Sequence, residues 1–439
     1  MADPRKIPTG RLSRLAKMTG LSTRVSSSYV VEKVKGVFQD EEERARSRLR
    51  AHIKNAERMV DTMGHMKGAL MKVGQMLSLG DDDHVPREFT DILTRLQADA
   101  PTLPFERVYD EIVAALKVQP DQIFERIDAE PLAAASLAQV HRARLKTGQD
   151  VVVKVQYPGI GDTVESDLDN LKAMIKSSGV VGKRFNLDAS FDEVKGMLLQ
   201  ELDYAQEADH LDFFREAFAH RDDVVVPRLY REYCTPKLLV MEYVEGLSFD
   251  DWLAQGPSQD EKDALAIRVM DLFFESFFKL RRIHADPQLG NFRFREDGTV
   301  VMLDFGCVRE FPEPFVDAYV EAIKAGYHPL QRQRLINVLH RLGFLDTPED
   351  GPLADYLLRH AELTVRAFAK DEPATFVGTD YPKEIKRLAI DPVVLKGLRF
   401  PPEIIYLNRV NIANYFLMRR LGVKTNFHRL LLRYVPKDR

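Results

Sequence analysis

The sequence of 439 residues has few cysteines, no strong charge of one sign and no long apolar run. Its two cysteines, Cys234 and Cys307, lie far apart without metal-ligand spacing, which favours a reducing compartment over secretion. No stretch approaches the ~18 consecutive apolar residues of a membrane-spanning helix, so we expect none. The net charge of -4 is too small to indicate a nucleic-acid partner. These absences predict a cytoplasmic protein without nucleic acid as a ligand.

The composition is that of a globular chain long enough for two lobes, with 45% hydrophobic and 30% charged residues. Charge is concentrated near the start, where residues 1–37 contain Lys and Arg in excess over Asp3 and Glu32. A basic segment with interspersed apolar residues can rest on an anionic membrane surface, so peripheral membrane contact is one interpretation. A solvated terminus is the other.

Hydrophobic periodicity divides the chain into elements of changing type. The predicted helices lie at 11–60, 56–79, 87–98, 105–116, 162–177, 190–219 and 271–283. The predicted strands are a hairpin at 138–145 and 151–157, followed by 224–233 and 238–244. This order predicts a basic helical segment, a helical extension, a small mixed lobe and a helical lobe, at residues 1–60, 61–120, 121–245 and 246–439.

The segment from His284 to Asn291, followed by Leu303-Asp304-Phe305-Gly306, carries most of the functional information. Its spacing of Asp, Asn and Asp is typical of the phosphate-handling half of a kinase fold. Asp286 can orient or deprotonate a nucleophile, with His284 helping to fix the loop. Asn291 and Asp304 supply the hard oxygen atoms that Mg²⁺ prefers. We expect the phenylalanines of the preceding helix to be core residues that hold this loop rigid.

Lys154 is a single cation within the apolar strand Val151–Val155. An inward-facing lysine needs a partner because an unpaired buried charge is costly, whereas an edge-strand lysine would face water. Asp203 and Glu207 are candidate partners that would share one face of a helix, with Glu201 elsewhere. In a kinase fold, such a lysine binds phosphates and a helix glutamate.

The glycine-rich loop expected ahead of such a lysine is absent. An alanine loop replaces it, and its residues are Ala133, Ala134, Ala135 and Ser136. Alanine adopts positive φ only at a cost, so this loop should approach phosphate in a different geometry.

These motifs together resemble the UbiB protein kinase-like family, the atypical kinases linked to ubiquinone biosynthesis, and above all its mitochondrial branch. The resemblance runs from about Lys6 to Arg409. It is carried by Lys72-x-Gly-Gln75, the alanine loop, Glu201-x-Asp203, His284-Ala-Asp286-Pro and Asp304-Phe-Gly.

The resemblance implies an α+β, two-lobed protein kinase-like fold with a helical N-terminal extension over the cleft. It implies ATP and Mg²⁺ as cofactors, Lys154 paired with Glu207, and an ATPase coupled to a lipid, a quinone precursor or a biosynthetic complex. The adenine-binding hinge would comprise Met241, Glu242 and Val244. The extension would act through Lys72 and Gln75 on the Glu201 and Asp203 region. Ala135 would restrain nucleotide selectivity.

Two departures from the family pattern are present. Gln288-Leu289 replaces the usual His-Pro of the catalytic loop, and the family's frequent membrane-spanning segments are absent. Two other functions stay open: a non-enzymatic nucleotide-sensing scaffold, and a small-molecule kinase of the aminoglycoside or choline type. The extension and the alanine loop disfavour the latter.

Overall fold

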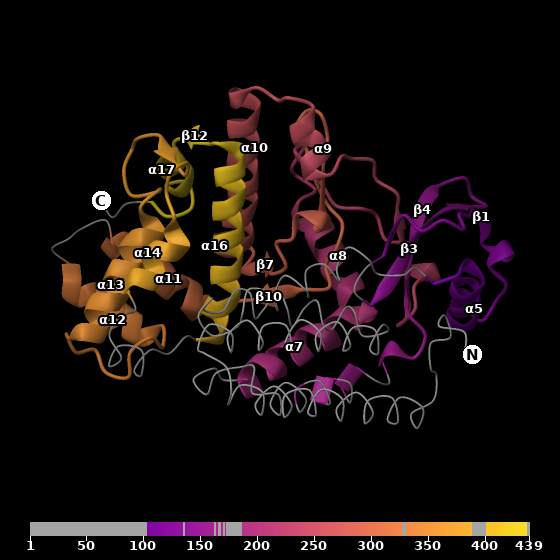
Figure 1. The fold of residues 1–439 in the computed structure, drawn as a ribbon, viewed down its shortest axis with the longest axis horizontal. Coiled ribbons are helices and arrows are strands. Elements are labelled where there is room, and N and C mark those ends of the chain that lie inside the picture. Colours follow the sequence, from indigo (N-terminus) through magenta and orange to yellow (C-terminus); the bar gives the residue numbers. More distant parts are fainter. Residues whose placement is uncertain are drawn as a thin grey trace, which may run out of the picture. The chain divides into compact units, whose positions relative to one another are not determined.

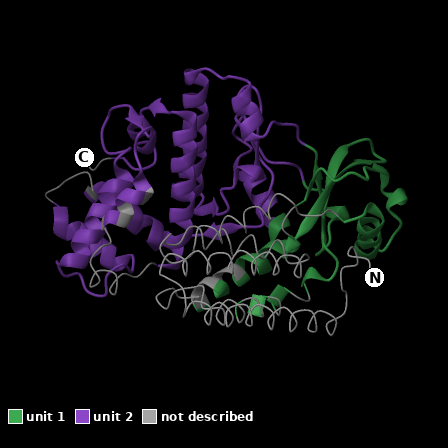
Figure 2. Cartoon of the chain, in the orientation of Figure 1, with its two compact units in different colours: residues 1–208, 229–243 green, residues 209–228, 244–439 purple. Residues whose placement is uncertain are grey.

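The computed structural model describes residues 103–134, 137–161, 164–165, 168–169, 172, 187–326, 331–388 and 401–436. The chain divides into two compact units, which Figure 2 distinguishes by colour. Unit 1 is residues 1–208 with 229–243, and unit 2 is residues 209–228 with 244–439. Several predictions lie outside the described residues: the helices before residue 103, Lys72, Gln75, Ala135 and Ser136.

Unit 1 is built on an antiparallel sheet with strand order β1-β3-β4-β6, to which β2 adds beside β3. Its strands are β1 (Phe124–Ile127), β2 (Ala133–Ala134), β3 (Ala138–Leu145), β4 (Asp150–Gln156) and β6 (Leu238–Glu242). Its helical elements are α5 (Phe105–Leu116), η3 (Pro120–Gln122), α7 (Leu187–Glu201), the start of α8 (Tyr204–Ala217) and η4 (Arg231–Tyr233). The predicted hairpin and the predicted helix at 105–116 are both present.

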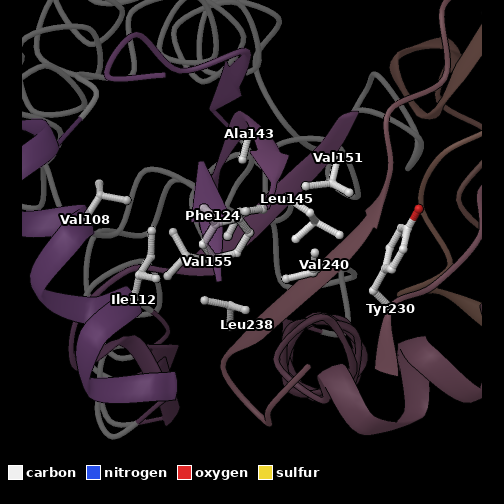
Figure 3. Packing of buried hydrophobic residues seen from close by; sticks show 11 residues of the cluster. Val108, Ile112, Phe124, Ala143, Leu145, Val151, Val155, Tyr230, Leu238 and Val240 are labelled. Atoms are coloured by element: carbon white, nitrogen blue, oxygen red, sulfur yellow. The ribbon is translucent and has the colours of Figure 1, made fainter. Parts of the chain in front are cut away.

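The core of unit 1 lies between α5 and one face of this sheet. Val108 and Ile112, one turn apart on α5, are almost fully buried against the sheet (Figure 3). Along β4, Val151, Val153 and Val155 face the same core. Because side chains alternate across a strand, Lys154 points to the opposite face.

The predicted helix at 190–219 is in fact two helices. α7 ends at Glu201 and α8 begins at Tyr204. Asp203 stands before α8, where its Oδ1 accepts a hydrogen bond from the backbone N–H of Gln206 at 3.0 Å. This is an N-cap, so Asp203 does not share a helix face with Glu207, contrary to the sequence prediction. A short acidic side chain satisfies exposed backbone N–H groups better at a helix start than in a helix interior.

Unit 2 is mainly helical. Its helices are α9 (Phe249–Ala254), α10 (Gln259–Phe274), α11 (Glu313–Gly326), α12 (Arg332–Arg341), α13 (Pro352–Val365), α14 (Tyr381–Leu388), α16 (Pro402–Leu421) and α17 (Phe427–Leu431). Its short strands are β5 (Val224–Val225), β7 (Arg282–His284), β8 (Phe292–Phe294), β9 (Val300–Met302), β10 (Val308–Glu310), β11 (Ala374–Thr375) and β12 (Lys424–Thr425). α10 and α16 pack side by side (Figure 1).

Two further predicted elements are wrong in extent. The strand at 224–233 is reduced to β5, since residues 231–233 form the 3₁₀ turn η4. The helix at 271–283 ends earlier: α10 passes into a π-helical turn, η5 (Glu275–Lys279), and Ile283 lies in β7. A run of large apolar residues fits a buried strand as well as a buried helix, so sequence alone could not separate them.

Among the described residues, no helix combines the length and apolar character that a membrane span requires.

Candidate active site

In unit 1 the site centres on Lys154. Its Nζ donates a hydrogen bond to Glu207 Oε1 at 2.6 Å, the pair implied by the family resemblance. Lys154 is held in the centre of the sheet, because β4 pairs with β3 on one side and with β6 on the other. The two side chains are 11% and 1% exposed, so the ion pair is nearly dry. The ring of Tyr204 lies beneath the ammonium, 5.3 Å from its centroid.

The break between α7 and α8 is tied to the same strand. Gln156, two residues after Lys154 and on the same side of β4, donates from Nε2 to the Leu202 carbonyl at 2.7 Å. This bond fixes the start of α8 against β4, and Glu207 lies one turn further along α8. Of the other acidic candidates, Glu201 is half-buried and Asp203 is exposed.

Met241 and Glu242 of the predicted hinge, and the described part of the alanine loop, lie in strands. Met241 is buried in β6, and Glu242, the last residue of that strand, is exposed and pairs with Val151. Val244 belongs to unit 2 and is half-buried. Ala133 and Ala134 form the exposed strand β2, which pairs with β3.

In unit 2 the site is a loop between β7 and β8. Asn291 Nδ2 donates to the carbonyl of Asp286 at 3.0 Å and lies 3.3 Å from its Oδ2. Because the amide nitrogen of Asn291 is used within the loop, its oxygen is the atom directed to other ligands. Asp286 itself is 8% exposed.

The second aspartate is held to this loop through its backbone. His284 Nε2 donates to the carbonyl of Asp304 at 2.6 Å, which gives His284 the loop-fixing role expected from sequence. Leu303 N–H donates to the Asn291 carbonyl at 2.9 Å. The Oδ1 of Asp304 accepts from Gly306 N–H at 2.9 Å, closing a turn at the Asp-Phe-Gly sequence.

The substituted pair Gln288-Leu289 is accommodated without disrupting this arrangement. Asn291 N–H donates to the Gln288 carbonyl at 2.9 Å, and residues 289–291 form a 3₁₀ turn, η6 (Leu289–Asn291). The turn therefore presents Asn291 through backbone bonds that do not depend on the side chains at 288 and 289.

Two residues near this loop were not assigned a role from sequence. Arg409, on α16, lies with Nη2 3.7 Å from Asp286 Oδ1, and both side chains are largely buried. Its neighbours Leu407 and Val410 pack in one core cluster with Ala285, which places α16 beside the loop. No local pattern indicates this contact, because more than a hundred residues separate the partners. The only signal was that the family resemblance extends to Arg409.

The other such residue is His210 of α8, whose ring supports the Asp-Phe-Gly turn. His210 Nδ1 donates to the Phe305 carbonyl at 3.2 Å. Burial lowers the pKa of His210, despite the opposing effect of the hydrogen bond, so the neutral ring is favoured. Phe305 is fully buried and lies 5.5 Å from the ring of Phe214, also on α8. The turn carrying Asp304 is thus anchored from α8.

The donor set suits a hard cation in combination with phosphate oxygens. Among the described residues, no group of three or more His, Cys, Asp or Glu side chains could hold a metal by itself. One carboxylate and one amide oxygen, from Asp304 and Asn291, are the kind of incomplete set with which Mg²⁺ is bound beside a phosphate ligand.

Comparison with known proteins agrees with this geometry. The ABC1 atypical kinase-like domain matches residues 95–338 of the chain. The chain belongs to this family. It is 30% identical to the rat atypical kinase COQ8B, mitochondrial, over 94% of this chain and 78% of that protein. It is 33% identical to the Caenorhabditis elegans atypical kinase coq-8, mitochondrial, over 87% of this chain, and spans only 51% of that relative's length.

A solved structure carries the same fold. The Rv3197 protein of Mycobacterium tuberculosis, determined with erythromycin, matches with a TM-score of 0.60 at 23% identity, over 87% of this chain and 96% of that one. The predicted kinase-like fold of mixed sheet and helix is thereby confirmed, as is membership of the UbiB-type family. The names of the two relatives place them in mitochondria, and neither supports the cytoplasmic location predicted from composition.

Proposed function

We propose that this protein is an ATP- and Mg²⁺-dependent atypical kinase-like ATPase or phosphotransferase that supports ubiquinone or isoprenoid-lipid biosynthesis. The observation that carries the proposal is the loop of unit 2, where Asn291 is bonded to Asp286 and His284 ties the Asp304 backbone alongside. That arrangement supports a phosphoryl-transfer site better than a structural turn, because it gathers several oxygen ligands in one loop.

Each residue has a distinct role in this proposal. Asp286 orients the attacking oxygen of water or of a small lipid hydroxyl and accepts its proton. Asn291 and Asp304 hold Mg²⁺, which neutralises charge on the phosphates when it is bound. Lys154 binds the phosphates, and Glu207 holds its ammonium in place at 2.6 Å. Arg409 sets the charge around Asp286 from α16.

The predicted partners complete the proposal. The backbone around Met241, Glu242 and Val244 receives adenine, and the alanine loop restrains nucleotide selectivity. The helical extension with Lys72 and Gln75 regulates turnover through Glu201 and Asp203. A lipid or quinone-precursor ligand, or a biosynthetic protein complex, triggers hydrolysis, and the basic segment at residues 1–37 contacts the membrane surface.

ATP hydrolysis tests this function directly. Phosphate release is measured for the wild type and for Asp286→Asn, with and without anionic liposomes and quinone-precursor phenols. We expect Mg²⁺-dependent hydrolysis that the additives stimulate and that Asp286→Asn lowers by at least ~100-fold, since general-base catalysis is typically worth this factor. Equal rates in the two proteins would refute the role of Asp286. Tight ATP binding without any turnover would instead favour the nucleotide-sensing scaffold.

A further inference from the structure

Two polar side chains lie fully buried on the core face of the unit 1 sheet, and the proposed chemistry uses neither. Gln139 and His141 stand two residues apart on β3, so both point to the same side of the sheet. His141 is directly opposite Val153 of β4, which belongs to the core packed against α5. A buried polar group is costly unless its hydrogen bonds are made, so the partners of this pair decide its role.

Gln139 binds the backbone of Leu103, shortly before α5. Its Oε1 accepts a hydrogen bond from Leu103 N–H at 2.9 Å, and its Nε2 donates to the Leu103 carbonyl at 3.4 Å. The N–H of Leu103 is a donor, and this fixes the orientation of the amide, with its oxygen towards that N–H. The segment before α5 is thus tied to β3 through the Gln139 side chain.

The amide nitrogen of Gln139 also lies 3.0 Å from Nε2 of His141. Because this amide nitrogen is a donor, His141 Nε2 must accept and therefore carries no proton. On the other side of the ring, Nδ1 lies 2.8 Å from the carbonyl oxygen of Asp128, so Nδ1 carries the hydrogen and donates it. The hydrogen bonds thus specify a neutral imidazole in the Nδ1–H form.

The surroundings of the ring favour this neutral form. Burial lowers the pKa of His141, and the carbonyl and carboxylate of Asp128 oppose this effect less strongly. The Asp128 carboxylate is exposed and lies 3.7 Å from the guanidinium of Arg126. From α5, the ring of Phe105 packs with its centroid 5.5 Å from that of His141, and Val153 stands opposite on β4. Asp128 is therefore a charged neighbour of the imidazole, but burial outweighs it.

A proton on His141 Nε2 is incompatible with these hydrogen bonds. It would place two donors 3.0 Å apart, at the contact with Gln139 Nε2. A half-turn of the amide would offer its oxygen to the imidazolium, but its nitrogen would then face Leu103 N–H and its oxygen would face the Leu103 carbonyl. Both hydrogen bonds to Leu103 would be lost. Proton binding by His141 and the binding of Leu103 by Gln139 therefore oppose one another, and such coupling is reciprocal.

We propose that Gln139 and His141 form an acid-sensitive latch, in which uptake of a proton by His141 makes Gln139 release the backbone of Leu103. The predicted extension with Lys72 and Gln75 precedes Leu103 in the sequence, and α5 follows it. Release of Leu103 by acid therefore loosens the connection between that extension and α5. The regulatory use of this release rests on the proposed function, whereas the latch itself involves no nucleotide.

The tautomer of His141 tests the first step on the wild type. Heteronuclear NMR of the full chain labelled at histidine distinguishes a proton on Nδ1 from one on Nε2, and His141→Asn identifies the signals of this ring by their loss. We expect the Nδ1–H form at about pH 8, well above the usual titration range of histidine. An Nε2–H form at that pH would overturn the proposal.

Hydrogen exchange of the Leu103 amide tests the release. The protection of this amide, corrected for the intrinsic effect of pH on exchange, is followed by mass spectrometry with residue-level fragmentation between about pH 8 and about pH 5. We expect protection to fall by roughly 5- to 30-fold as His141 titrates, the factor that corresponds to one or two net hydrogen bonds. The amide of Lys117, which donates to the Val113 carbonyl at 2.8 Å at the other end of α5, should keep its protection. No loss at Leu103, or equal losses at Leu103 and Lys117, would overturn the proposal.

Gln139→Glu reverses the effect of acid with little change of shape. Its carboxylate accepts hydrogen bonds from Leu103 N–H and from protonated His141 together, so the pKa of His141 should be higher than in the wild type. Leu103 should then stay protected on acidification. A fall in protection equal to that of the wild type would overturn the proposal.

His220→Asn is the matched control, because the side chain of His220 is 59% exposed, and this variant should keep the wild-type response. Should Gln139→Glu fail to fold, the tautomer and the Leu103 exchange of the wild type still decide the proposal. None of these measurements includes nucleotide or lipid, so their outcome is separate from that of the ATP hydrolysis test.

Discussion

Replacing Glu207 by Gln removes the carboxylate that lies 2.6 Å from the ammonium of Lys154, and we expect the change to destabilise the protein by about 3–5 kcal/mol. The size of this destabilisation follows from the burial of the ion pair. At an effective dielectric constant of about 20, unit charges at this distance attract by about 6 kcal/mol. Part of that attraction offsets the desolvation of both groups. Removing one partner loses the attraction and leaves the other charge in a nearly dry site.

A mutant cycle separates the ion pair from packing. Urea unfolding is followed by circular dichroism for the wild type, Glu207→Gln, Lys154→Met and the double variant. We expect each single change to be strongly destabilising and the double variant to recover most of the loss, because it buries no charge. Asp128→Asn is the control, since Asp128 and Arg126 form an exposed pair worth at most about 1 kcal/mol. A loss below about 1 kcal/mol for Glu207→Gln would refute the reasoning.

Single contacts lead to three other predictions. Arg409→Met should destabilise the protein, and adding Asp286→Asn to that variant should restore part of the lost stability. The coupling free energy between the two changes, measured by urea unfolding, should be about 0.5–3 kcal/mol; additive effects would contradict a direct interaction. Asp203→Ala should cost about 1 kcal/mol by removing the N-cap of α8, whereas Asp203→Asn should cost little; equal losses would exclude capping. Burial lowers the pKa of His141 below 6.5, the usual value for histidine, so just below pH 6.5 the folded state binds fewer protons than the unfolded state. Stability should therefore fall as pH drops below about 6.5, and the melting temperature of His141→Asn should fall less steeply; parallel slopes would contradict this.

Local sequence predicted the parts of the fold in which short-range periodicity and turn chemistry agree. The β3–β4 hairpin is an example, because Gly148 adopts a φ of +95° in the turn that the sequence Lys-Thr-Gly-Gln indicates. α5 is another, since its apolar residues recur at one-turn spacing between Pro104 and the left-handed Lys117. The boundaries of α8 and β7 were missed because neighbouring segments decide them, through Gln156 and through pairing with β10.

The candidate site, like the fold, could be predicted from the sequence only in part. The aspartates and the asparagine were recognisable because the roles proposed for them require those residue types at characteristic spacings along a short stretch. Lys154 was recognisable as a single cation within an apolar strand. The contact of Arg409 with Asp286 was not, because the two residues lie on segments far apart in the chain.

The order of residues thus determined which family the chain belongs to and which groups are the candidates for its chemistry, since both follow from contiguous motifs. Only the tertiary structure decided that Arg409 faces Asp286. Contacts between segments far apart in the chain depend on how helices pack, and packing is set by the combined shape of many side chains rather than by any local pattern.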